Sequence, residues 1–340
     1  MPGALANRWY TNGGETMRRR ILIAAIALAA IFGAMPGATQ AQSPGGVIRI
    51  VIPFAPAGSA DLLARLLQAP LQEELQQTVI IENHAGAGSN IGTSEVARAK
   101  PDGRTLLITT SAFVVNPSLY RNITYDYSKL EPIGLLPAAP NVLAVNPKQG
   151  GINSLADLIA RAKAEPQKFN YSSPGNGTTP QLMMELFKLT TGAAVTNIPY
   201  NGGGPATQAL MSGTVDILST ALPGAQAQIR AGTMKGIALT TDERWPTLPG
   251  VPTFKELGYP NVALSNQHFF LAPSGTPAAE IERFSKAAIK VISREDIKKR
   301  LIDLGFMPSV EGPEAAKARI AKDVALYRDL IARAKIPQVQ

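Results

Sequence analysis

The chain has 340 residues, 45% hydrophobic and 17% charged, and 33 Lys and Arg against 25 Asp and Glu give a net charge of +8. This balance is ordinary for a globular protein, so disorder is not the default, and the length allows two domains. Cysteine is absent and the histidines are His84 and His268, which excludes thiol catalysis, disulfides and Cys-ligated zinc and leaves a metal site unsupported.

The N-terminal stretch has the pattern of a secretion signal. Residues 17–42, MRRRILIAAIALAAIFGAMPGATQAQ, join a basic run, an apolar run and a small-residue end. We expect residues 1–41 to be an upstream segment and signal peptide, started at Met17 and cut after Ala41, with a twin-arginine signal as the alternative. Its removal takes away four Arg and one Glu and lowers the net charge from +8 to +5. The predicted location is the periplasm.

Short β-branched runs alternate with amphipathic helical stretches along the rest of the chain, which is typical of α/β proteins. We expect, in chain order, a strand at 47–54, a helix at 61–75, a strand at 78–83, a helix at 90–99 and a strand at 105–110. A Pro-rich passage at 132–147 ends in a strand. The second half predicts helices at 154–164, 180–190 and 205–212 and strands at 168–172, 195–200, 215–220 and 234–240. A return strand at 261–273 and helices at 277–292, 294–303 and 313–335 complete the pattern.

The strand and helix series in each half of the chain predicts a separate, mainly parallel sheet with covering helices. We expect domain 1 to comprise residues 44–143 plus 265–340, because of the return strand, and domain 2 to comprise residues 144–264, with the linker near 140–147. The basic run 298–300 lacks interleaved aromatic residues, so it indicates a solvated helix face, and nucleic acid is not an expected partner.

Two loops of similar design connect a strand to a helix. In FAPAGSAD (54–61) we expect Ser59 to cap the helix, with Asp61 in its first turn. In YSSPGNGTTP (171–180) we expect Thr179 as the cap and Pro180 at the first helical position. Ligands in parallel sheets lie beyond the carboxyl ends of the strands, and helix starts bind anions. The two loops therefore predict a site for a small acid, unless each only caps its own helix.

Motifs for catalysis are missing from the sequence. HAGAGSNIG (84–92) has the spacing G-x-G-x-x-x-G and no Lys-Ser/Thr pair, so we interpret it as a turn that seats a helix rather than a nucleotide site. Neither histidine has a motif partner, and we expect structural roles for both. We expect no cofactor, no metal and no catalytic residue.

The sequence resembles a known family over residues 46–335. The stretches IRIVIPFAPAGSADLLARLL, VIIENHAGAGSNIGTSEVARAKPDGRTLL, FNYSSPGNGTTPQLMMELFK, IPYNGGGPATQALMSGTVDI and LPGVPTFKELG are similar to the tripartite tricarboxylate transporter receptors, also called the Bug family. The resemblance implies a type II-like two-domain periplasmic binding protein fold with a ligand cleft between the domains. It implies a monomeric receptor that delivers a small organic acid to the permease subunits of a membrane transporter.

The resemblance also implies which residues bind the acid, largely through backbone N–H groups, hydroxyls and ordered waters. Carried over to this chain, they are Phe54, Ala57, Gly58, Ser59, Ser172, Ser173, Gly175, Asn176, Gly177 and Thr178, with Thr109, Ser111 and Tyr200 as further candidates.

Three departures from the family pattern affect the ligand. The loop PGGGxD becomes PAGSAD, the segment Phe-Asp-Asn becomes Ser219, Thr220 and Ala221, and an SW signature becomes SNQHFF at 265–270. We expect Thr220, Ala221 and His268 at the far end of the pocket. Because no carboxylate is evident there for an ammonium group, we expect a dicarboxylate without an amino group.

Two other functions stay open on the sequence alone. The loaded protein could dock on a sensor kinase, which no sequence feature tests. A secreted hydrolase using Asp61 or His268 is disfavoured because no residue pair has the spacing of a nucleophile and its base.

Overall fold

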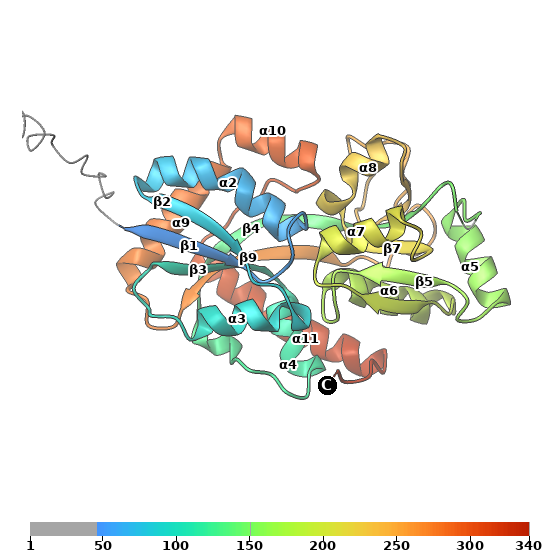
Figure 1. The fold of residues 1–340 in the computed structure, drawn as a ribbon, viewed down its shortest axis with the longest axis horizontal. Helices are drawn as coiled ribbons and strands as arrows, with labels where there is room; N and C mark the ends of the chain where they lie inside the picture. The colour runs from blue at the N-terminus through green and yellow to red at the C-terminus, as the bar shows by residue number, and fades with distance from the viewer. Residues whose placement is uncertain (1–45, 150, 340) are drawn as a thin grey trace, which may run out of the picture. The chain divides into compact units, whose positions relative to one another are not determined.

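One continuous sheet runs through the computed structural model, which describes residues 46–149 and 151–339 (Figure 1). Its strand order is β2-β1-β3-β9-β4-β7-β5-β6, and β8 also pairs with β4. The strands are β1 (Val47–Ile52), β2 (Thr78–Asn83), β3 (Thr105–Thr110), β4 (Leu130–Val145), β5 (Asn170–Ser173), β6 (Thr196–Pro199), β7 (Ile217–Ala221), β8 (Lys235–Leu239) and β9 (Ser265–Pro273). The predicted signal peptide lies outside the described residues.

Helices cover both faces of this sheet, which confirms the α/β fold class. They are α2 (Ser59–Leu75), α3 (Asn90–Ala97), α4 (Ala112–Leu119), α5 (Leu155–Ala164), α6 (Thr179–Thr191), α7 (Gly203–Met211), α8 (Gln226–Arg230), α9 (Ala278–Ile292), α10 (Glu295–Leu304) and α11 (Pro313–Arg333), with 3-10 turns η1 (Ala87–Ser89), η2 (Tyr127–Lys129) and η3 (Leu222–Gly224). Sequence analysis missed α4 and α8. The first is apolar almost throughout and contains Pro117, and the second has five residues, so neither shows a helical period.

The two halves of the sheet are joined by strands rather than by a linker. Strand β1 is parallel to β2 and β3, and β5 is parallel to β6 and β7, while β4 and β9 pair antiparallel with their neighbours. The passage expected to contain a linker at 140–147 therefore lies mostly within β4, of which only the C-terminal end was predicted as a strand. Its prolines are tolerated because the register against β9 shifts between Pro132 and Gly134 and between Leu136 and Ala139. The two-domain boundaries stay a prediction.

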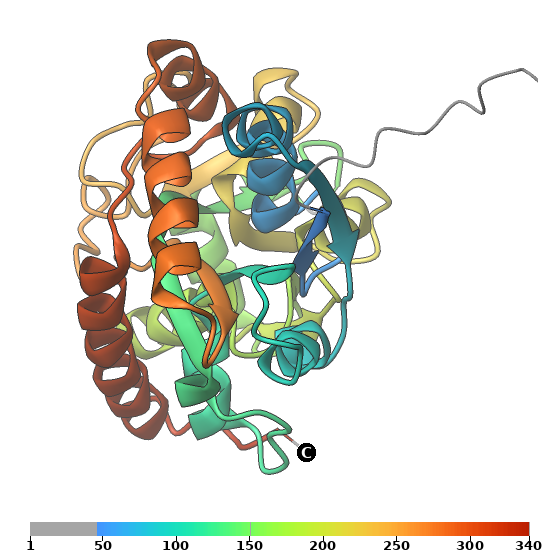
Figure 2. The ribbon, with the colours of Figure 1, turned by 90° about the vertical axis from the view of Figure 1, so that its left-hand side faces the viewer.

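Alternating side chains of the strands supply two apolar layers. Ile48, Ile50 and Ile52 of β1 pack in the layer that contains α2 and α9, whereas Val51 packs in the layer that contains α4 and α11. This alternation is the two-residue period of a strand that is buried on both faces. Helices α9 and α11, orange and red in Figure 2, both contact β4. The long strand is thereby held by the C-terminal part of the chain.

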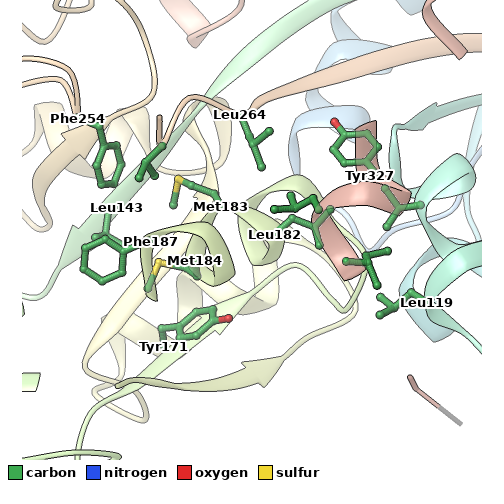
Figure 3. Packing of buried hydrophobic residues seen from close by; sticks show 14 of the residues in the cluster. Leu119, Leu143, Tyr171, Leu182, Met183, Met184, Phe187, Phe254, Leu264 and Tyr327 are labelled. Carbon is green, nitrogen blue, oxygen red and sulfur yellow. The ribbon is translucent and has the colours of Figure 1, made fainter. Parts of the chain in front are cut away.

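Helix α6 buries one face almost completely, and this fixes the position of its N-terminus. Leu182, Met183 and Phe187 are fully buried on it. The Phe187 ring packs edge-to-face on Phe254, with 6.4 Å between ring centroids, and Leu143 of β4 lies beside them (Figure 3). Because burial of large apolar side chains is the main source of stability, this face anchors the helix.

We predict that Phe187→Ala destabilises the protein strongly, since it leaves a cavity and removes the aromatic pair. The expected loss of unfolding free energy is about 3 to 5 kcal/mol in urea titrations. Leu189→Ala on the same helix is the matched control, because Leu189 is 53% exposed, and it should change stability by about 0.5 kcal/mol or less. Equal effects of the two substitutions would contradict the packing described for α6.

His268 of β9 is a fully buried imidazole between β4 and the C-terminal segment. Its Nδ1 lies 2.7 Å from the Pro137 carbonyl oxygen, and its ring centroid lies 5.6 Å from that of Phe306. Since a carbonyl only accepts hydrogen bonds, Nδ1 carries the proton. Burial lowers the pKa of His268 to about 4, against an opposing contribution from the bond to Pro137. The ring is therefore neutral near pH 7.

A histidine whose pKa is lower in the folded state than its ordinary value of 6.5 makes stability fall as pH decreases from 6.5 to about 4. In that window the unfolded chain binds the proton and the folded protein does not, so the contribution reaches about 1.4 kcal/mol per pH unit. We predict that His268→Gln flattens the decline of unfolding free energy, measured by urea denaturation across this range. Parallel profiles for parent and variant would show that His268 does not carry the effect.

Candidate functional site

Three strand-to-helix turns meet at one small cavity: the starts of α2, α6 and α7, which follow β1, β5 and β6. The residues that line it are Phe54, Gly58, Ser59, Ala60, Thr110, Pro174, Thr178, Pro180, Gly203, Thr220, Ala221 and Asn266. Measured as the space open to the centre of a water molecule, its volume is about 20 Å³, which is room for roughly one water. Entry of a larger guest requires the surrounding loops to open.

The cavity wall carries no ionisable side chain among the residues that line it. Positive potential comes instead from the three helix starts. Each leaves backbone N–H groups without an intrahelical partner and adds the positive end of its dipole. Such an arrangement is suited to a small anion.

The turn before α2 is shaped by Asp61. Gly58 is the N-cap in an extended conformation and Ser59 is the first helical residue, so the prediction that Ser59 caps the helix was wrong. Asp61 lies in the first turn as predicted, and its Oδ2 accepts a hydrogen bond of 2.9 Å from the Ala57 N–H. Its Oδ1 accepts from Arg65 and from Asn83, at 2.9 and 3.0 Å. These bonds hold exposed Ala57 at φ 65°, away from the cavity wall.

Helix α6 begins one residue earlier than predicted. Thr178, not Thr179, is the N-cap, and Pro180 is the second helical residue. The Thr178 hydroxyl donates to the Gly175 carbonyl at 2.7 Å, and the Thr179 hydroxyl donates to Asn266 Oδ1 at 3.1 Å. The Thr179 hydroxyl thus forms a hydrogen bond with strand β9 and does not cap the helix.

The two serines of β5 also direct their hydroxyls into the protein. Ser172 Oγ donates to the Ala206 carbonyl at 2.9 Å, and Ser173 Oγ donates to Asn197 Oδ1 at 2.8 Å. Asn197 in turn donates to Asn176 Oδ1 at 3.0 Å. These side chains brace α7, β6 and the turn before α6.

Only part of the predicted set reaches the cavity wall. Phe54, Gly58, Ser59, Thr178, Thr220 and Ala221 line it. The predicted residues that do not line it are Ala57, Thr109, Ser111, Ser172, Ser173, Gly175, Asn176, Gly177, Tyr200 and His268.

Glycines let the turns before α2 and α7 come into backbone contact. The Ala55 N–H donates to the Asn201 carbonyl at 2.8 Å. A Cβ added at Gly203 would lie 3.2 Å from the Cα of Gly58, and one added at Gly204 would lie 2.3 Å from the Pro56 carbonyl oxygen. Only residues without side chains permit this approach.

Asn266 and His268 of strand β9 contact Ser59 of α2, although the two segments are far apart in the sequence. The Ser59 Oγ lies 2.9 Å from His268 Nε2, and Asn266 Nδ2 donates to Ser59 Oγ at 2.9 Å. A serine and a histidine thus meet, although no spacing in the sequence suggests the pair. The other ring nitrogen faces the Pro137 carbonyl rather than a carboxylate, so the third group of a hydrolytic triad is missing from this arrangement.

Sequence reasoning missed half of the cavity wall. Thr110 faces the cavity, whereas its predicted neighbour Thr109 has a fully buried hydroxyl oxygen without a partner among the described residues. Ser111 donates to the buried Asp323 at 2.9 Å. The glycine run at the start of α7 was a visible signal for Gly203, but nothing in the sequence singled out Asn266.

Residues 46–149 and 151–339 contain neither a metal site nor a membrane-spanning helix. No group of three His, Cys, Asp or Glu side chains there could hold a metal ion. Over the same residues, no helix combines the length and apolar character needed to cross a membrane.

Known proteins place the chain in a family. Residues 63–335 match the family described as "Tripartite tricarboxylate transporter family receptor". Protein BugT of Bordetella pertussis is 34% identical over 291 residues, which cover 85% of this chain and 89% of BugT. The structure of the periplasmic binding protein BugD superimposes with a TM-score of 0.82 at 31% identity, covering 86% of this chain and 99% of BugD.

A further solved structure is similar over the same region. A protein of R. palustris solved with adipate has a TM-score of 0.84 at 30% identity, and the match covers 87% of this chain and 99% of that protein. Both the family match and the relatives span most of the described residues. The chain therefore belongs to the family of tripartite tricarboxylate transporter receptors, which are periplasmic solute-binding proteins and not enzymes.

Proposed function

We propose that this receptor captures a small dicarboxylate without an amino group and delivers it to the permease subunits of a tripartite tricarboxylate transporter. The observation that carries this proposal is the meeting of three helix N-termini at a cavity without a charged side chain. Location in the periplasm rests on the family and on the predicted signal peptide.

Backbone groups are the proposed donors to the first carboxylate. Gly58, Ser59 and Ala60 line the cavity at the start of α2, and Gly203 lines it at the start of α7. Each hydrogen bond from a neutral donor to a charged oxygen contributes about 1.5 to 3 kcal/mol. A few such bonds, together with the helix dipoles, hold an anion without Arg or Lys.

An ammonium group would find no partner in this cavity. Thr220 and Ala221 supply no charge there, and Asp61 is already bonded to Ala57, Arg65 and Asn83. Burying an unpaired cation costs several kcal/mol. This excludes amino acids as preferred ligands in our proposal, and the adipate of the R. palustris relative, a diacid, is in line with it.

The first test is isothermal titration calorimetry with matched pairs, succinate against aspartate and glutarate against glutamate. We predict that the diacid without the amino group binds more tightly in each pair, because only the amino member brings an unpaired cation. Tighter binding of aspartate or glutamate would contradict the proposal.

A second prediction concerns closure of the loops around the ligand. Gly204→Ala should weaken binding of the preferred diacid by about tenfold or more, because its Cβ would lie 2.3 Å from the Pro56 carbonyl oxygen and would separate the starts of α2 and α7, whose N–H groups are the proposed donors. Because the Pro56 oxygen is a backbone atom, one of the two turns must shift, so the thermal midpoint of the ligand-free variant is measured as well, to separate a loss of stability from a loss of affinity. Gly250→Ala, with no atom within 4 Å of its Cβ, is the control. Unchanged affinity of Gly204→Ala would show that the contact is not part of closure.

A further inference from the structure

The hydroxyls on the cavity wall differ in whether they already donate a hydrogen bond within the protein. Thr178 donates to the Gly175 carbonyl at 2.7 Å. Ser59 lies 2.9 Å from His268 Nε2, which accepts because Nδ1 carries the ring proton toward Pro137. Both of these hydrogens are used inside the protein.

Thr110 and Thr220 keep their hydrogens available. The Thr110 oxygen only accepts, from the Ala112 N–H at 3.4 Å, and the Thr220 hydroxyl has no hydrogen-bond partner among the described residues. Both residues are nearly buried, at 4% and 1% exposure, and both line the cavity. Thr220 Oγ1 is not among the fully buried polar atoms that lack a partner, so it keeps access to the cavity, and an acceptor on a ligand there would pair with its O–H.

The two threonines reach the cavity from different strands. Thr110 is the last residue of β3, next to His268 of β9 in the pairing register, and Thr220 lies near the end of β7. A Cβ added at Gly203 would lie 3.3 Å from Thr220 Oγ1, so the glycine keeps this oxygen uncovered. The pair can therefore contact one small group from two sides.

A packing role is the simpler reading of each threonine, since β-branched residues are common in strands. Thr109 shows what that role looks like, because its unpartnered oxygen is fully buried in the core and does not line the cavity. The difference between Thr109 and Thr110 is thus access to the cavity, and access is what a ligand contact needs.

We propose that Thr110 and Thr220 bind the second carboxylate of the ligand and set the preference for a diacid over a monoacid of the same chain length. This inference rests on the proposed function and names the side chains that carry it. Two neutral O–H donors contact the two oxygens of the distal group, while the helix starts hold the first carboxylate.

The test is calorimetric titration of succinate, glutarate and adipate against butyrate, valerate and hexanoate. Thr110→Val and Thr220→Val, which keep the side-chain shape and remove the hydroxyl, should each weaken the preferred diacid by about tenfold and leave the monoacid unchanged. Thr110→Ser and Thr220→Ser keep the O–H and should retain the diacid preference. Thr109→Val is the matched control and should bind as the parent does, and circular dichroism checks that each variant is folded.

Two results would overturn the inference: parental diacid affinity in both valine variants, or equal weakening of diacid and monoacid. If the parent protein prefers the diacid but the valine variants keep that preference, the proposed function stands and the threonine assignment fails. If the parent binds none of the six acids, the proposed function fails and this inference fails with it.

Discussion

Backbone contact between the turn before α2 and the turn before α7 is the constraint on which the candidate site depends. The hydrogen bond from the Ala55 N–H to the Asn201 carbonyl and the approach of Gly203 to Gly58 bring two helix starts to one cavity. The third start, of α6, is fixed by the buried face that carries Phe187 and by the bond from Thr179 to Asn266. In our proposal the backbone supplies the donors, and the side chains on the wall set selectivity.

Most polar side chains of the two predicted loops form hydrogen bonds within the protein. Ser172 and Ser173 brace neighbouring elements, and Asp61 holds its own loop. Ser59 forms a hydrogen bond with His268, and complete burial keeps the imidazole of His268 neutral because it lowers the pKa of the ring. The polar residues of the turns thus act mainly as a scaffold for the N–H groups, which explains how a chain without Arg or Lys at the cavity could still hold an acid.

The helical period and the turn chemistry were enough to predict most elements and to place the starts of α2, α6 and α7 within two residues. Asp61 lies in the first turn of α2 as the local rules of capping indicate, whereas Ser59 and Thr179, the expected caps, are the first helical residues. Strand β4 could not be predicted over its full length, because its prolines are accommodated by register shifts that depend on β9. Thr110 could not be told from Thr109, since the face of a strand that meets a cavity is set by its neighbours. The meeting of Ser59 with His268, 209 positions apart, has no local signal at all.

The central claim is that backbone N–H groups at helix starts hold the ligand carboxylate, and a crystal structure of the receptor with its preferred diacid tests it most directly. We predict one carboxylate within hydrogen-bonding distance, about 2.7 to 3.2 Å, of N–H groups at the starts of α2, α6 or α7. A diacid bound outside this cavity, or one whose carboxylates are held mainly by Arg or Lys side chains, would contradict the account.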